Sequence, residues 1–288
     1  MTSRLPISQP EHSPSWHAEL HLGFARAGER TVLRENRHRG PLRVQKALYP
    51  EGEAVCQTIV LHPPSGIAGG DHLAISAEVG EGSHAQLTTP GAGKWYRSGG
   101  AEASQRVAFT VGEGATLEWL PQETIVFDGA RARMETQVDL AADSRYIGWD
   151  ILCLGRVAAG ERFEKGRFDL FLQVNRDQRP IWIERGGFDG SDPMLISPAG
   201  WAGATVCGTL LCAFPEWPMQ ASALLEACRK IVPADGAQHG LSALPGVLIA
   251  RYLGNSSEAA RLWFAELWTI LRPACCGRPA VIPRIWNT

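Results

Sequence analysis

The chain has little net charge and lacks the cysteine spacings of a structural metal site. Its 288 residues include 28 basic and 30 acidic side chains, which leaves a formal net charge of −2. A nearly neutral chain lacks the cationic field that nonspecific nucleic-acid binding requires, so no nucleic-acid partner is expected. The seven cysteines are odd in number, scattered, and include no C-x-x-C pair. We therefore predict reduced thiols, no structural zinc and a cytoplasmic location.

Long apolar runs are also missing. Residues 1–16 contain charges, prolines and serines but no apolar core of signal-peptide length, which predicts a flexible N-terminal segment. Residues 193–215 carry no charge, yet prolines and glycines interrupt them repeatedly. This composition argues against a transmembrane helix, and we expect no membrane partner.

Common catalytic motifs are absent as well. The sequence contains no G-x-S-x-G elbow, no H-E-x-x-H helix and no G-x-G-x-x-G turn. Residues 91–94 look like the end of a phosphate loop, but Thr88 stands where its first glycine belongs. Trp95 follows Lys94 where a serine or threonine would have to reach magnesium, so nucleotide binding is not indicated.

The pattern that is present changes near residue 215. Before it, short runs bounded by turn residues predict strands at residues 57–61, 103–111, 116–120, 136–140, 167–174 and 180–184. After it, helical periodicity predicts helices at residues 219–232 and 256–271, the second with Asn255 and Glu258 at capping spacing and Pro273 at its end. We expect a single domain over residues 17–288, β-rich to residue 215 and containing two helices from residue 216.

A faint repeat runs through the β-rich part. Residues 79–82 (Val-Gly-Glu-Gly) recur as residues 111–114, and a degenerate third copy begins near Asp143. Such spacing is typical of stacked solenoid coils, but repeated hairpins in a β-sandwich would produce it equally well.

Three segments carry candidate functional residues. The loop at residues 62–72 holds His62, Asp71 and His72, which could contact a divalent cation, although Asp71 could instead close its own turn. Residues 118–129 hold Glu123 and Asp128. These two residues are five positions apart, so on an extended strand their side chains lie on opposite faces. The spacing therefore implies no paired acid/base site. Either residue could still line a polar cavity with Asp71.

The remaining candidates are cationic and aromatic. Lys94, Trp95, Tyr96 and Arg97 follow a Pro-Gly turn, and this mixture suits a partner-binding surface or internal packing equally well. In the last helix Trp263 falls on the apolar stripe, whereas Trp268 turns away from it. We expect that second face to be available for docking. Because exposed members of the ten tryptophans would make the surface adhesive, we also expect the isolated chain to be poorly soluble and to become more soluble with a partner present.

Several long motifs resemble those of the UreD family of urease accessory proteins, also called UreH. They occur in the same order at residues 40–52, 61–71, 88–98, 117–129 and 283–286. The resemblance covers residues 17–288. It departs from the family pattern at Ala47, where proline is frequent, and at Ser65, where glycine is usual and where serine could stiffen the loop.

The resemblance implies a right-handed β-helix or solenoid-like stack of sheets with two C-terminal α-helices, which favours the solenoid. It also implies a protein that is not an enzyme and holds no tightly bound cofactor. Such a protein links apo-urease to the accessory proteins UreF and UreG, and an internal polar passage conducts transient Ni²⁺. Asp71, Glu123 and Asp128, with His62 as a weaker candidate, are then expected to line that path with weak single ligands.

Two other functions stay open. One is a β-solenoid carbohydrate-active enzyme that uses Glu123 and Asp128 as acid and base. The other is a plain interaction module without metal transit.

Overall fold

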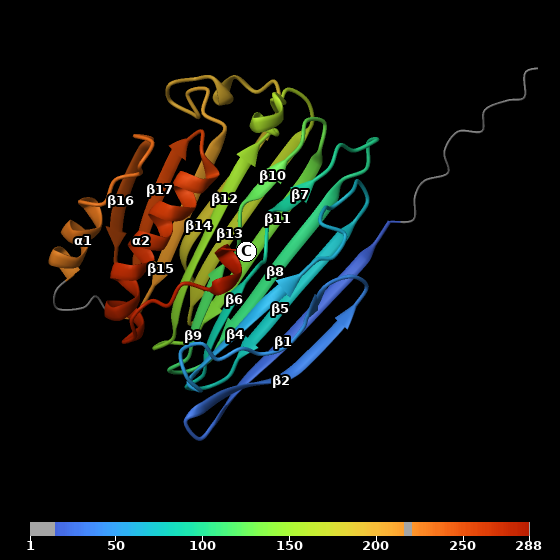
Figure 1. Ribbon diagram of the computed structural model, residues 1–288. Coiled ribbons are helices and arrows are strands. Elements are labelled where there is room, and N and C mark those ends of the chain that lie inside the picture. The colour runs from blue at the N-terminus through green and yellow to red at the C-terminus, as the bar shows by residue number, and fades with distance from the viewer. Residues whose placement is uncertain (1–14, 216–220, 288) are drawn as a thin grey trace, which may run out of the picture.

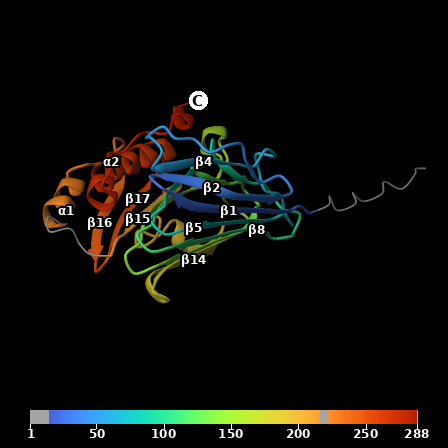
Figure 2. The same cartoon turned by 90° about the horizontal axis from the view of Figure 1, so that it is seen from below.

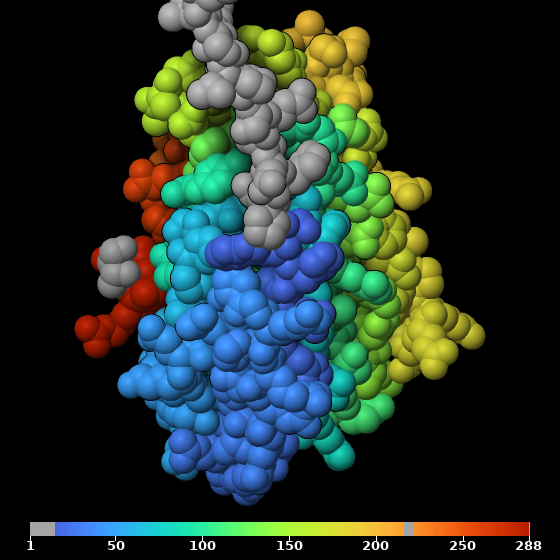
Figure 3. All heavy atoms as spheres, turned by 90° about the vertical axis from the view of Figure 1, so that its right-hand side faces the viewer, coloured from blue at the N-terminus to red at the C-terminus, as the bar shows by residue number. Residues whose placement is uncertain are grey.

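Two stacked β-sheets form the body of the protein, and helices cover the outer face of one of them (Figure 1, Figure 2). The computed structural model describes residues 15–215 and 221–287. The seven-stranded sheet has the order β14-β13-β11-β8-β5-β1-β2. The ten-stranded sheet has the order β16-β17-β15-β12-β9-β6-β4-β3, with β7 and β10 attached beside β12. Figure 3 faces the end of the stack where β1 and β2 lie.

The strands are β1 (His17–Ala27), β2 (Arg30–Arg39), β3 (Arg43–Val44), β4 (Val55–Leu61), β5 (His72–Val79), β6 (His84–Thr88), β7 (Gly93–Trp95), β8 (Ala103–Val111), β9 (Thr116–Leu120), β10 (Thr124–Val126), β11 (Arg131–Leu140), β12 (Arg145–Leu154), β13 (Arg167–Arg176), β14 (Arg179–Asp189), β15 (Val206–Ala213), β16 (Gln238–Leu244) and β17 (Val247–Gly254). The helices are α1 (Ala221–Arg229) and α2 (Ser257–Cys276), with short 3₁₀ turns at Val157–Ala159, Pro193–Leu195 and Arg284–Asn287.

The body is a β-solenoid of about four turns. From β4 to β13 the chain alternates between the two sheets, and strands of successive coils pair in parallel. Val79 pairs with Val111, and Val111 pairs with Leu140, so the repeat seen in the sequence is one coil lying on the next. Asp143 accepts the backbone N–H of Gly114 at the following corner, which places the degenerate third copy in the same stack.

The two sheets differ in how they are buried. Strands of the seven-stranded sheet alternate between buried and exposed positions, as in β5, because only their inner face is covered. Strands β6 and β9 of the other sheet are buried at every position. Helix α2 and the C-terminal segment lie across their outer face (Figure 1), and Trp286 donates to the Thr88 hydroxyl there.

Both predicted helices are present, with different boundaries. The structure describes the first as Ala221–Arg229, and residues 219 and 220 lie outside the described residues. In the second, Ser256 rather than Asn255 caps the helix, because its hydroxyl accepts the N–H of Ala259. Pro273 does not end the helix, which continues to Gly277 at positive φ. No helix in the described ranges is long and apolar enough to cross a membrane.

A hairpin between the two helices was not predicted. Strands β16 and β17 pair with each other, and β17 pairs with β15, so the hairpin extends the larger sheet. The short turn at residues 245–246 and the mostly exposed β16 leave only a weak periodic signal in this stretch.

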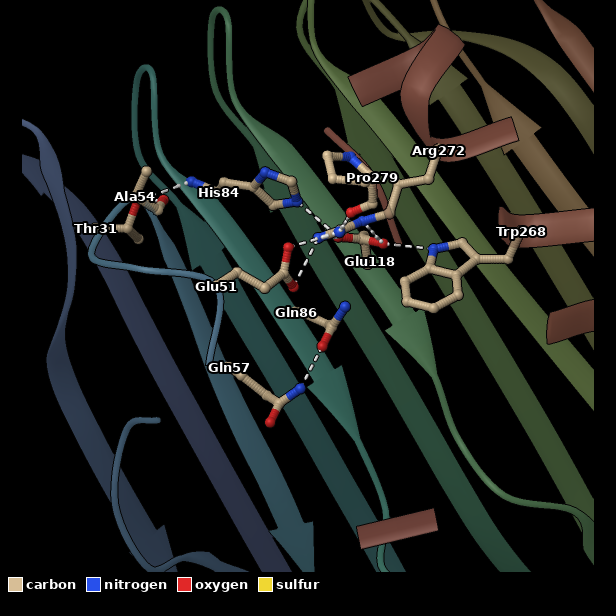
Figure 4. Close-up of polar contacts among 10 residues, drawn as sticks. All are labelled: Thr31, Glu51, Ala54, Gln57, His84, Gln86, Glu118, Trp268, Arg272 and Pro279. Carbon is tan, nitrogen blue, oxygen red and sulfur yellow. Dashed lines mark hydrogen bonds and ion pairs between the residues drawn. The ribbon is translucent and has the colours of Figure 1, made fainter. Parts of the chain in front are cut away.

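A buried ionic network ties α2 to the larger sheet (Figure 4). Arg272 contacts the carboxylates of Glu118 at 2.9 Å and Glu51 at 2.6 Å, and His84 Nε2 lies 2.7 Å from Glu118 Oε1. Burial alone would raise the pKa of Glu118, but His84 and Arg272 outweigh it and lower that pKa to about 2.

Trp268 belongs to the same network, which corrects our expectation of an exposed second face on the last helix. Its side chain is fully buried, and its indole N–H donates to Glu118 Oε2 at 2.7 Å. Trp263 is buried too, with its N–H bonded to the carbonyl of Ile231, whereas Leu262 is exposed. More than one side of helix α2 is therefore buried, because the sheet, α1 and the C-terminal segment all pack on it.

Candidate functional site

A row of polar side chains crosses the interior of the sandwich, where the other inward positions are mainly apolar. Asp150 on β12 pairs in register with Thr209 on β15, which pairs with Arg251 on β17. Arg251 Nη1 reaches Thr209 Oγ1 at 3.3 Å and Glu184 Oε1, on β14 of the opposite sheet, at 2.7 Å. Thr209 is buried and Asp150 is partly buried, whereas the side chain of Arg251 is 45% exposed, so the row runs from the interior to the surface. Burying the first two groups costs free energy unless they are paired, so their position needs a reason other than core packing.

This row lies beside two adjoining internal cavities. The first has a volume of about 330 Å³ and the second about 180 Å³, and Thr124, Met134 and Asp150 line both of them. Because they share these lining residues, the two cavities lie side by side between the sheets, and we call them the first and second chambers. Polar residues lining the first chamber include His62, Lys94, Gln105, Gln122 and Thr136, and those lining the second include Glu184, Cys207, Thr209 and Arg251.

Asp150 stands at the junction of the chambers, and its electrostatics are unusual. Burial raises the pKa of this carboxyl to about 7, and the negative charge of Glu184 contributes to the rise. The protonated and charged forms of Asp150 are therefore both populated near neutral pH. Burial likewise raises the pKa of Cys207 to about 11, so its thiol is neutral.

The donors around Asp150 are spaced rather than gathered. Glu184 Oε2 is buried and has no hydrogen-bond partner within the described part of the chain. Among the described residues no three His, Cys, Asp or Glu side chains converge as a metal site. The arrangement offers single oxygen or sulfur ligands to a small cation but no closed coordination shell.

Of the four residues expected on a nickel path, only His62 lines a chamber. Burial lowers its pKa, and the nearby charge of Asp71 partly offsets that effect. The Asp71 carboxylate accepts the N–H groups of Trp16 and Ala68, both at 2.9 Å, so it closes its own loop. Ser65 in that loop has a φ of 65°, the left-handed conformation that explains why glycine is usual there.

Glu123 and Asp128 do not line either chamber. Gln122 and Thr124 face the first chamber, and Glu123 between them points elsewhere because side chains of an extended chain alternate. Asp128 Oδ1 accepts the N–H groups of Glu164 and Lys165, at 2.8 and 2.7 Å. Asp128 therefore has a local structural role. That Asp128 or Glu123 takes part in a nickel path stays a prediction.

The cationic and aromatic segment divides between the interior and the surface. Lys94 lines the first chamber, and Trp95 is 2% exposed, so both belong to the interior. Tyr96 is 36% exposed and packs over Gly66, where a Cβ would lie 2.2 Å from its ring. The exposed side chain of Arg97 lies 3.5 Å from the Asp128 carboxylate. Tyr96 and Arg97 are the exposed residues of this segment, and a partner-binding role for them stays a prediction.

The sequence analysis missed the residues that surround the junction. Asp150 interrupts an otherwise apolar and aromatic run at residues 146–154, and Thr209 and Arg251 interrupt two similar runs. Each is a polar residue in a strand whose other residues are mostly apolar, and this pattern is the sequence signal that could have identified the three residues. Their convergence with Glu184 depends on how the two sheets face each other, which no local pattern contains.

Residues 17–287 match the family described as UreD urease accessory protein. A relative from Azoarcus sp. (strain BH72) is 53% identical over 275 residues, which are 96% of this chain and 95% of the relative. A relative from Pseudomonas fluorescens is 53% identical over 284 residues, 99% of each chain, and one from Pseudomonas aeruginosa is 50% identical over 289 residues, 100% of each. All three are named urease accessory protein UreD. The chain belongs to the UreD family of urease accessory proteins.

Proposed function

We propose that this protein takes part in urease maturation as an accessory factor and not as an enzyme. It links apo-urease to the UreF–UreG complex in the cytoplasm and assists nickel delivery through its interior. The two adjoining chambers with Asp150 at their junction are the observation that carries this proposal. The family membership supports the role in urease maturation.

Charge at the junction suits a passing cation. Arg251 compensates Glu184, which leaves Asp150 as the titrating group on the shared wall. A carboxyl with a pKa of about 7 loses its proton readily when Ni²⁺ approaches and regains it when the ion leaves. Isolated oxygen ligands hold such an ion weakly, whereas a complete set with outer-shell support would trap it.

The enzymatic alternative has no geometric support. Acid/base hydrolysis of a glycoside needs two carboxyls about 5 to 9.5 Å apart across one cleft. The Asp128 carboxylate is occupied by backbone N–H groups, and Glu123 does not line a cavity with it. A plain interaction module remains the competing function, and the experiment below separates it from nickel transit.

The test blocks the junction between the chambers. We expect Thr124→Trp to fill the shared wall and to lower the nickel content of urease at least about tenfold when the chain is co-expressed with apo-urease, UreF and UreG. Thr124→Val is the matched control, because it keeps the volume and leaves the passage open. Nickel per urease active site is measured by mass spectrometry, and pull-down checks that the complex still forms. Full nickel loading with Thr124→Trp in an intact complex would favour the plain interaction module.

A further inference from the structure

Two histidines lie side by side on the outer face of the seven-stranded sheet. His17 opens β1 and His72 opens β5, and the two residues pair in register on these parallel strands. Their ring centroids are 5.1 Å apart, with 32° between the ring planes, and both side chains are exposed. Imidazoles at this separation can turn toward a common point without moving the backbone.

The hydrogen bonding of His72 favours metal binding. Its Nδ1 lies 2.7 Å from the hydroxyl of Ser104 on the neighbouring strand β8. When Nδ1 donates that bond, Nε2 carries the free lone pair. Metal-binding histidines usually hold their second nitrogen in this way, by donating it to an oxygen.

The surroundings do not oppose a cation at this place. In the same row of the sheet Ser104 follows His72, and Arg133 follows Ser104. The guanidinium of Arg133 is paired with Glu102 at 3.2 Å. The Asp71 carboxylate, which precedes His72, is turned toward the N–H groups of Trp16 and Ala68. The two imidazoles therefore supply the ligands at this spot.

We propose that His17 and His72 together bind a borderline divalent cation of the kind that prefers imidazole, with Ni²⁺ as the relevant member. Two imidazoles with water in the remaining positions make a weak and exchangeable site. His72 follows the loop that begins at His62, and His62 lines the first chamber. As an external capture point for the ion, the histidine pair rests on the proposed transit function.

Calorimetric titration of the purified full-length chain with NiCl₂ tests the site. His17→Ala and His72→Ala are each expected to weaken binding at this site at least about tenfold, because the second imidazole acts at high effective concentration. Ser104→Ala should weaken it by about tenfold through the lost orientation of His72. His38→Ala, which removes an exposed imidazole on β2, is the control and should change nothing.

Two further measurements make the result specific. Paramagnetic Ni²⁺ should broaden the ring-proton NMR signals of His17 and His72 together, and a chelator should reverse this. Thr124→Trp leaves both histidines in place and should bind Ni²⁺ normally while delivery fails, so this site and the passage are tested separately. If the double variant His17→Ala/His72→Ala binds Ni²⁺ like the unmodified chain, the proposal is overturned.

Discussion

Asp150 is expected to destabilise the fold at neutral pH, and replacing it with asparagine should reveal by how much. Its pKa rises from an ordinary value of 3.8 to about 7 in the folded protein. The folded state therefore binds this proton more tightly than the unfolded state, and stability falls as the pH rises from about 4 to about 7. A rise of about three pKa units corresponds to at most about 4 kcal/mol of unfolding free energy.

Urea denaturation followed by tryptophan fluorescence measures this effect at pH 4 and pH 8. Asp150→Asn cannot ionise, so its unfolding free energy relative to the unmodified chain should be about 2 to 4 kcal/mol higher at pH 8 than at pH 4. Any cost of burying the amide is the same at both pH values and cancels in this difference. Asp177→Asn, in the β13–β14 turn at a φ of 47°, is the control, because asparagine tolerates that conformation. An Asp150→Asn effect that is the same at both pH values would refute the reasoning.

Two more predictions concern packing. Arg272→Met should lower the unfolding free energy by about 3 to 5 kcal/mol, because it removes the buried guanidinium that pairs with the carboxylates of Glu118 and Glu51. Urea denaturation measures this, and Arg229→Met on the surface of α1 is the control. Because folding lowers the pKa of Glu118, the stability that its charged form contributes is fully present above about pH 4.5 and is lost as the pH falls toward 2. If Arg272→Met destabilised the fold equally down to pH 2, the loss of the Glu118 ion pair would not be the cause. Gly66→Ala should cost about 1 to 3 kcal/mol, because a Cβ there collides with Tyr96. A Tyr96→Ala background should remove most of that loss, and an equal loss in both backgrounds would show that the collision is not its cause.

The structure removes one reason for expecting the isolated chain to be poorly soluble, namely exposed tryptophans. Six tryptophans are buried, and Trp16 is the one among the described residues that stands out as exposed. Poor solubility of the isolated chain and improvement with UreF stay predictions, but exposed tryptophans are not a basis for them. Other exposed apolar side chains, such as Ile196 and Val232, would have to cause any such behaviour.

The sequence alone determined the local elements and the repeat. Strand runs such as residues 103–111 and 116–120 coincide with β8 and β9, because alternation and flanking turn residues are local properties. The echo of residues 79–82 at residues 111–114 predicted a structural repeat without deciding its kind, and in the structure the two copies are corners of adjacent coils. The family resemblance then selected the solenoid over the sandwich, which periodicity had left open.

Only the tertiary structure decided which polar residues matter and which surfaces are free. The sequence analysis selected Asp71 and Asp128, whose carboxylates accept backbone N–H groups in the structure, and their part in a nickel path stays a prediction. It did not select Asp150, which looked like part of a buried strand. Trp268 looked exposed until α2, the sheet and the C-terminal segment were placed together. A side chain's partners come from strands and helices distant in sequence, and the low dielectric they create sets its charge. The two cavities between the sheets therefore follow from the way the sheets face each other, which local sequence does not specify.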